Sequence, residues 1–195
     1  MSLRIVIADD EAVIRLGLRT MLEERGYRVV GEAGDGKRVL DLVGKLRPDL
    51  VFLDIKMPGL DGLAAAERLQ ESAHVPVILL TAYGERSLIE RAQRAGVMGY
   101  LMKPLRETDL APAIEVALAR FRDLRSMAAE ITDLQEDLET RKLVERAKGA
   151  LMDRLGLSEE EAYRRIQTAS RASRRSMKEI AQQVLAGEDL PQHVR

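Results

Sequence analysis

Short apolar runs alternate with amphipathic segments over the first 120 residues of the chain. Residues 51–53 and 77–80 are apolar throughout, as strands covered on both faces should be. Five β–α units in series predict an α/β fold, with a five-stranded parallel, doubly wound sheet and right-handed crossovers. The expected strands are Leu3–Ala8, Arg28–Ala33, Leu50–Leu53, Val75–Leu80 and Gly99–Leu101.

The pattern becomes helical after Leu101, with one long helix from Glu107 towards Leu155. A 4-3-4 spacing typical of a coiled-coil seam joins Phe121, Leu124, Ala128, Ile131, Gln135 and Leu138. The same stripe could instead be one amphipathic helix packed on its own domain. We favour a paired coil, and hence a homodimer, because an exposed seam of this length needs a partner.

Two capping boxes indicate two further helices near the C-terminus. In this motif a serine begins the helix and a glutamate three residues later bonds back to it. Gly156 and Gly187 suit helix ends. We expect an all-α, three-helix module formed by the end of the long helix and residues 159–172 and 177–186. The boxes are Ser158 with Glu161 and Ser176 with Glu179. The expected domains are residues 1–120, a coiled-coil linker helix at 121–140, and 141–195.

Composition narrows the possible chemistry and cellular location of the protein. The chain has no cysteine, which excludes disulfides and thiolate metal sites. It begins with a strand-like stretch, and no window approaches the 18 or so apolar residues of a membrane span. We therefore expect neither a signal peptide nor a membrane anchor, and a cytoplasmic location.

Charge is distributed unevenly although the formal net charge is −1. Residues 123–139 hold six acids and one base, a net charge of −5. Residues 141–178 hold eleven bases and five acids, a net charge of +6. The basic block is informative about partners, whereas the net charge is not.

Polar side chains gather where the expected strands end. Asp9 and Asp10 follow the first strand, Asp54 the third, Thr81 the fourth and Lys103 the fifth. Converging carboxylates need a cation, and oxygen ligands with open positions suit Mg²⁺. A carboxylate nucleophile, a hydroxyl and a lysine beside that metal supply what in-line phosphoryl transfer needs.

Each of these residues also has an ordinary structural interpretation. An aspartate at a strand end is usually a turn residue or a helix N-cap, and a Lys-Pro pair is usually a turn. Five polar residues at one edge of a parallel sheet are much harder to explain in that way.

The motifs resemble the receiver domain of two-component response regulators over residues 3–120. They are Ile7-Ala8-Asp9-Asp10-Glu11, the run from Leu53 to Gly62, Leu80-Thr81-Ala82, and Tyr100-Leu101-Met102-Lys103-Pro104. The resemblance implies a flavodoxin-like sheet. It also implies a cognate histidine kinase, with no enzymatic activity other than the receiver's own phosphoryl transfer and dephosphorylation.

The resemblance assigns roles to individual residues. Asp54 would be the phosphoacceptor. Asp9 and Asp10 would organise Mg²⁺, with Asp10, Asp54 and the main-chain carbonyl of Lys56 as direct ligands. Thr81 and Lys103 would hold the phosphoryl oxygens, and the Lys103–Pro104 bond would be cis. Tyr100 matches the switch position, which turns inward as Thr81 moves towards the phosphate.

The basic C-terminal block admits several partners. Its charges could lie on a merely solvated helical face. A DNA-binding helix-turn-helix needs a full recognition helix, but only eight residues, interrupted by Pro191, follow Gly187. A protein partner remains the main alternative to a nucleic acid.

The run from Arg141 to Met152, followed by Leu155 to Tyr163, resembles the ANTAR family of transcription antitermination regulators, over residues 134–187. Ser170 departs from that pattern, which often has an apolar residue there. The resemblance implies binding to paired hairpins in nascent RNA. Basic side chains suit RNA phosphates, and an aromatic ring suits an unstacked base. Tyr163 could instead pack between the helices. The expected RNA contacts are Lys148 and Arg146, then Arg141, Tyr163, Arg174 and Arg175.

Overall fold

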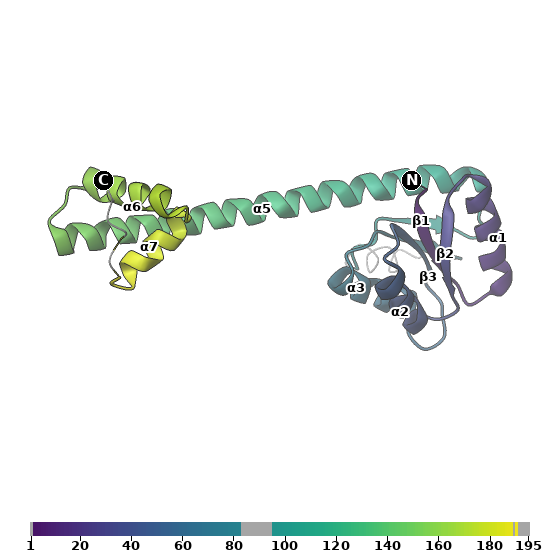
Figure 1. Ribbon diagram of the computed structural model, residues 1–195. Coiled ribbons are helices and arrows are strands. Elements are labelled where there is room, and N and C mark those ends of the chain that lie inside the picture. The colour runs from purple at the N-terminus through teal and green to yellow at the C-terminus, as the bar shows by residue number, and fades with distance from the viewer. Residues whose placement is uncertain (1, 83–94, 189, 191–195) are drawn as a thin grey trace. The chain divides into compact units, whose positions relative to one another are not determined.

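The computed structural model describes residues 2–82, 95–188 and 190 (Figure 1). Contacts divide the chain into two compact units, residues 1–125 and 126–195. The boundary lies inside one long helix, so both units share a continuous backbone there. The predicted boundaries at residues 120 and 140 stay predictions.

A five-stranded parallel sheet forms the centre of the first unit, in the order β2-β1-β3-β4-β5. This confirms the predicted fold class. Asp54 and Thr81 are the last residues of their strands, whereas the sequence predicted that each follows its strand. The strands are β1 (Arg4–Ala8), β2 (Arg28–Ala33), β3 (Leu50–Asp54), β4 (Val77–Thr81) and β5 (Gly99–Met102).

Helices cover both faces of this sheet. Leu18 and Leu22 of α1 pack with Leu110 and Ile114 of α5 in one core cluster, and α2 and α3 contribute to the other. Burying one leucine in such a cluster contributes about 2 kcal/mol. The helices are α1 (Ala12–Glu24), α2 (Gly36–Leu46), α3 (Gly62–Ser72) and α5 (Glu107–Leu155). Residues 83–94, between β4 and β5 where the β–α pattern predicts a further helix, lie outside the described residues.

Local hydrogen bonds fix where the helices behind the sheet begin. The carboxylate of Asp35 accepts the backbone N–H of Arg38 at the start of α2. The carboxylate of Asp61 accepts that of Ala64 at the start of α3. These caps satisfy backbone donors that the helices leave unpaired. The N–H of Gly62 donates to the carbonyl of Ile55 at 2.9 Å, which holds the start of α3 close to the end of β3.

The second unit is a three-helix module built on the end of α5. The helices α6 (Glu159–Ser173) and α7 (Met177–Leu185) follow α5, and both predicted capping boxes are present. Gly156 has a φ of +68°, which suits the predicted helix end. Ser170 donates a 2.6 Å hydrogen bond to the carbonyl of Arg175, so this departure from the family pattern stabilises the turn between α6 and α7.

The middle of α5 carries an exposed apolar stripe. Its large members are Leu124, Met127, Ile131, Leu134 and Leu138, each more than half exposed. The predicted seam shared three of these residues. Phe121, which was also placed in the seam, is partly buried against the core of the first unit. The large apolar residues between Leu124, Ile131 and Leu138 are Met127 and Leu134, whereas the predicted seam had Ala128 and Gln135 between them.

None of the helices among the described residues combines the length and the apolar character needed to cross a bilayer.

Candidate phosphoacceptor site and nucleic-acid interface

Three aspartates lie together at the carboxyl edge of the sheet. Asp9 and Asp10 directly follow β1, and Asp54 ends β3. Because β1 and β3 are parallel neighbours, with Ala8 opposite Leu53, their ends bring these side chains together. One carboxylate oxygen from each aspartate lies within 4.8 Å of the other two. Asp9 and Asp54 are buried, and Asp10 is exposed.

Lys103 supplies the positive charge beside these carboxylates. Its Nζ lies 2.7 Å from Oδ2 of Asp9 and 2.8 Å from Oδ1 of Asp54. Burial raises the pKa of Asp54, and the ammonium of Lys103 offsets part of this increase. Burial also acts to lower the pKa of Lys103, but the hydrogen bonds to Asp54 and Asp9 outweigh it and leave that pKa raised. Lys103 therefore stays charged and links the two strand ends.

A cavity of about 200 Å³ opens beside Asp54. Thr81, which ends β4 and is 7% exposed, lies on its wall. Lys56, from the segment after β3, and Lys103 also line it. The sheet thus brings the predicted carboxylate, hydroxyl and lysine to one small polar space.

The donor set fits Mg²⁺. Carboxylate oxygens at this spacing are the ligands that this ion prefers, and the adjoining cavity leaves room for the waters it retains. Lys56, whose main-chain carbonyl the receiver resemblance implies as a ligand, lines the same cavity as Asp10 and Asp54.

Tyr100 lies in β5 with its side chain on the surface, 54% exposed. Residues of β5 alternate between partly buried and exposed, and Tyr100 shares the exposed set with Met102. The ring therefore does not occupy a buried position beside Thr81 in this structure. The Lys103–Pro104 bond is cis, as predicted.

The second unit presents its basic side chains from all three helices and the turn between α6 and α7. Arg141 and Arg146 are exposed on α5, and Arg174 and Arg175 are exposed where α6 ends. In the described part of the chain, Arg141, Arg146 and Arg174 form no ion pair. Tyr163 is 43% exposed and lies outside the buried cluster of this unit, so it is not one of its core residues.

Lys148 has a different environment from the other predicted contacts. Its side chain is 8% exposed, and its Nζ lies 2.9 Å from Glu145 and 2.7 Å from Glu159. Hydrogen bonds to these carboxylates raise the pKa of Lys148. The lysine therefore joins α5 to the start of α6. Ala147 beside it is completely buried in the core of the unit.

Comparison with known proteins decides the family. The model of the response regulator receiver domain matches residues 5–115, and that of the ANTAR domain matches residues 132–185. The chain belongs to the response regulators and carries an ANTAR domain. It is 48% identical to the transcriptional regulatory protein PdtaR of Mycobacterium tuberculosis, over 93% of this chain and 89% of that protein.

Other similar proteins share the receiver alone. The sporulation initiation phosphotransferase F of Bacillus subtilis is 35% identical over 59% of this chain and 93% of its own length. Among solved structures, the receiver domain of a modulated diguanylate cyclase from Desulfovibrio desulfuricans has a TM-score of 0.59. It is 32% identical and covers 63% of this chain and 98% of its own. The receiver of the putative response regulator NarL from Mycobacterium tuberculosis has a TM-score of 0.58, with 32% identity over 60% and 97% of the two chains.

Sequence reasoning missed one residue of the receiver site. The guanidinium Nη1 of Arg15, in α1, donates to the carbonyls of Asp9 at 2.7 Å and of Asp10 at 3.3 Å. Its Nε lies 3.6 Å from Glu32 of β2. Arg15 thereby fixes the backbone that presents the two aspartates. The sequence offers little signal for this role, because an arginine inside a helix is normally a solvated residue.

Proposed function

We propose that this response regulator accepts a phosphoryl group on Asp54 from a histidine kinase and, as a dimer, binds paired RNA hairpins to promote transcription antitermination. The observation that carries the proposal is that one chain combines the Asp54–Lys103 site with an ANTAR module. In that module the exposed Arg141, Arg146 and Arg174 form no ion pair among the described residues.

Phosphoryl transfer would use groups already close together. A carboxylate oxygen of Asp54 would attack phosphorus in line, forming the acyl phosphate as the bond to the donor's nitrogen breaks. Bound Mg²⁺, held by Asp10, Asp54 and the carbonyl of Lys56 with Asp9 organising the site, would neutralise the phosphoryl oxygens. Lys103 would exchange its bond to Asp54 for one to a phosphoryl oxygen, and Thr81 would donate to another. The same site would support hydrolysis of the acyl phosphate.

Phosphorylation would then alter the surface around β5. The phosphoryl group carries close to two negative charges but replaces the single charge of the Asp54 carboxylate, so the cavity that Thr81 lines gains about one negative charge. Movement of Thr81 towards it would open space behind β4, and the exposed ring of Tyr100 would turn inward to fill that space. Loss of Tyr100 from the surface would change which partners that face binds.

Dimerisation would bury the exposed stripe of α5. Leu124, Met127, Ile131, Leu134 and Leu138 recur at alternating intervals of three and four residues, as in a two-stranded coiled coil. Replacing Leu134 by glutamate in both subunits should weaken the dimer about a hundredfold or more, since each leucine contributes at least about 1.5 kcal/mol. Thr132→Glu, with the same new charge two residues away, is the control. Light scattering across a concentration series, with and without phosphorylation, gives the two dissociation constants. Equal effects of the two substitutions would contradict the stripe as the dimer seam.

RNA contacts would come from the exposed basic residues of the second unit. Arg141, Arg146, Arg174 and Arg175 would bind phosphates, and Tyr163 would stack on an unpaired hairpin base. Lys148 would make a contact once an RNA group replaces one of its two carboxylate partners. Glu159→Gln should then tighten RNA binding, and Lys148→Met should weaken it.

The test uses the whole protein with Mg²⁺ and acetyl phosphate as donor. It is incubated with pooled RNA hairpins and with duplex DNA at physiological salt, and the retained nucleic acid is sequenced. We expect enrichment of paired hairpins that falls with Asp54→Asn and with Arg146→Ala. Asp41→Asn, an exposed carboxylate of α2, is the matched control for the first substitution.

Two other results would replace the RNA proposal. Equal, salt-sensitive retention of RNA and DNA would indicate non-specific binding to phosphates. If no nucleic acid is retained and one protein is recovered in stoichiometric amount, the C-terminal helices bind a protein partner instead. Phosphoprotein mass measured in the same samples keeps failure of phosphorylation separate from failure of RNA binding.

A further inference from the structure

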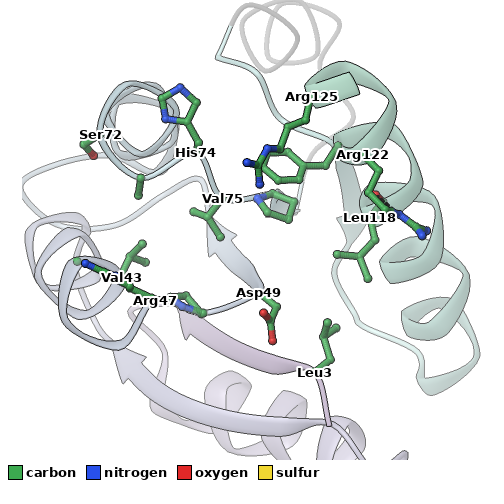
Figure 2. Close-up of a pocket in the computed structure, with 15 residues that line it drawn as sticks. Leu3, Val43, Arg47, Asp49, Ser72, His74, Val75, Leu118, Arg122 and Arg125 are labelled. Carbon is green, nitrogen blue, oxygen red and sulfur yellow. Dashed lines mark hydrogen bonds between the residues drawn. The ribbon is translucent and has the colours of Figure 1, made fainter. Parts of the chain in front are cut away.

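A second and larger cavity lies at the opposite edge of the sheet from Asp54. Its volume is about 810 Å³, and every residue that lines it belongs to the first unit. Figure 2 shows its three sides: the segment before β3, the segment before β4, and α5. Because the strands are parallel, the segments that precede them meet at this amino-terminal edge, away from the phosphoacceptor.

Apolar side chains line part of this cavity. Two of the lining residues are buried valines: Val43 of α2 and Val75 of the segment before β4. Leu118 and Phe121 line it from α5, and Leu3 lines it from the segment before β1. A volume of this size, lined by apolar side chains together with several polar ones, falls in the range of small-molecule sites.

The rim carries unbalanced positive charge. Arg47, Arg122 and Arg125 line the cavity, and among the described residues none of them forms an ion pair. The guanidinium of Arg125 lies 5.9 Å from the centre of the Phe121 ring. Asp49 is the lining carboxylate, and its Oδ2 already accepts the backbone N–H of Arg4 at 2.8 Å.

We propose that this cavity binds a small anion with a flat apolar body, bearing one carboxylate or phosphate group. The flat body would lie on the apolar walls beside Phe121, and the acidic group would take charge-assisted hydrogen bonds from Arg125 and Arg47. Pairing would satisfy guanidinium donors that have no carboxylate in the described structure. A neutral ligand would gain the apolar contacts without this pairing.

Binding here joins segments that are separate in the sequence. The ligand contacts the segment before β3 at Arg47, the segment before β4 at Val75, and α5 at Phe121 and Arg125. These α5 residues directly adjoin Leu124 and Met127 of the apolar stripe. Occupancy therefore protects the backbone amides of residues 118–125, inside α5, from local opening, which hydrogen exchange measures independently of phosphorylation and RNA.

The test uses 8-anilinonaphthalene-1-sulfonate, an anion with flat apolar rings, as a fluorescent probe of the full chain. We expect saturable binding, displaced competitively by 2-naphthoate or by adenosine monophosphate. 2-Naphthoate presents a carboxylate and adenosine monophosphate a phosphate, so the compound that displaces the probe at lower concentration identifies the preferred acidic group. Failure of both compounds to displace the probe overturns the proposal.

Substitutions locate the binding. Arg125→Ala should weaken probe binding about tenfold, the equivalent of one charge-assisted hydrogen bond. Arg38→Ala, an exposed arginine of α2 outside the cavity, is the matched control and should change nothing. Ala73→Phe keeps every arginine but fills space at the cavity wall, and it should weaken binding as well. Unchanged binding in Arg125→Ala and Ala73→Phe, or an equal loss in Arg38→Ala, overturns the assignment.

Discussion

Gly62 is the position at which one methyl group should disrupt the phosphoacceptor site. It begins α3, and its N–H donates a 2.9 Å hydrogen bond to the carbonyl of Ile55. A Cβ added to Gly62 would lie 1.9 Å from the carbonyl oxygen of Asp54 and 2.8 Å from its carbonyl carbon. These neighbours are backbone atoms of a strand end, so no side-chain rotation relieves the contact.

The expected loss of stability in Gly62→Ala follows from how far the clashing atoms must move apart. Carbon–oxygen contacts in proteins begin at about 3.3 Å, so the two atoms must separate by more than about 1 Å. Asp61 caps α3 one residue earlier, and the N–H of Gly62 itself is bonded to Ile55, so the helix start cannot move alone. Backbone shifts of this kind cost about 1–3 kcal/mol and occasionally more. We expect Gly62→Ala to reach at least about 3 kcal/mol because the Asp54 backbone moves as well.

Native-state hydrogen exchange of β1 and β3 amides measures this loss within the receiver, and acetyl phosphate labelling measures its effect on Asp54. Gly17→Ala is the control. Gly17 lies inside α1 with open space around its Cβ position, so alanine should stabilise the protein by about 0.5–1 kcal/mol. A Gly62→Ala protein within about 0.5 kcal/mol of the parent, with normal labelling, would refute the steric argument.

Three further outcomes are expected. Ile180→Ala, at a completely buried residue of α7, should lower the free energy of unfolding of the second unit by about 2–5 kcal/mol in urea titrations, leaving acetyl phosphate labelling unchanged. Hydrogen bonds from the backbone and hydroxyls of Ser158 and Ser176 lower the pKa of Glu161 and Glu179 from 4.5. Their contribution to stability is complete above pH 4.5 and is lost as the pH falls through the lowered values. Thermal melts at pH 6 and pH 3 should therefore differ more for the parent than for a Glu161→Gln, Glu179→Gln protein. Lys103→Met should make receiver stability more dependent on Mg²⁺, because it removes the ammonium between two carboxylates; equal melting shifts with Mg²⁺ in both proteins would contradict this.

The sequence predicted the sheet and the position of its site closely. Runs such as residues 77–80 are apolar on both faces, which only a covered parallel strand accommodates. Parallel strands end at one edge, so polar residues after each run had to meet there. Asp9, Asp54, Thr81 and Lys103 do so. Local hydrogen bonding also made the two capping boxes predictable, since each box involves residues three apart.

Contacts between distant residues were decided by the tertiary structure alone. Spacing placed Phe121 in the α5 seam, but the core of the first unit extends far enough to cover it. Sequence marked Lys148 as an RNA contact, which stays a prediction, but only the chain reversal into α6 brings Glu159 within 2.7 Å of its ammonium. The large cavity needs three separate segments to come together. Periodicity and capping depend on neighbours a few residues away and can therefore be predicted from the sequence. Burial and ion pairing depend on which surfaces meet once the chain has folded, so they cannot.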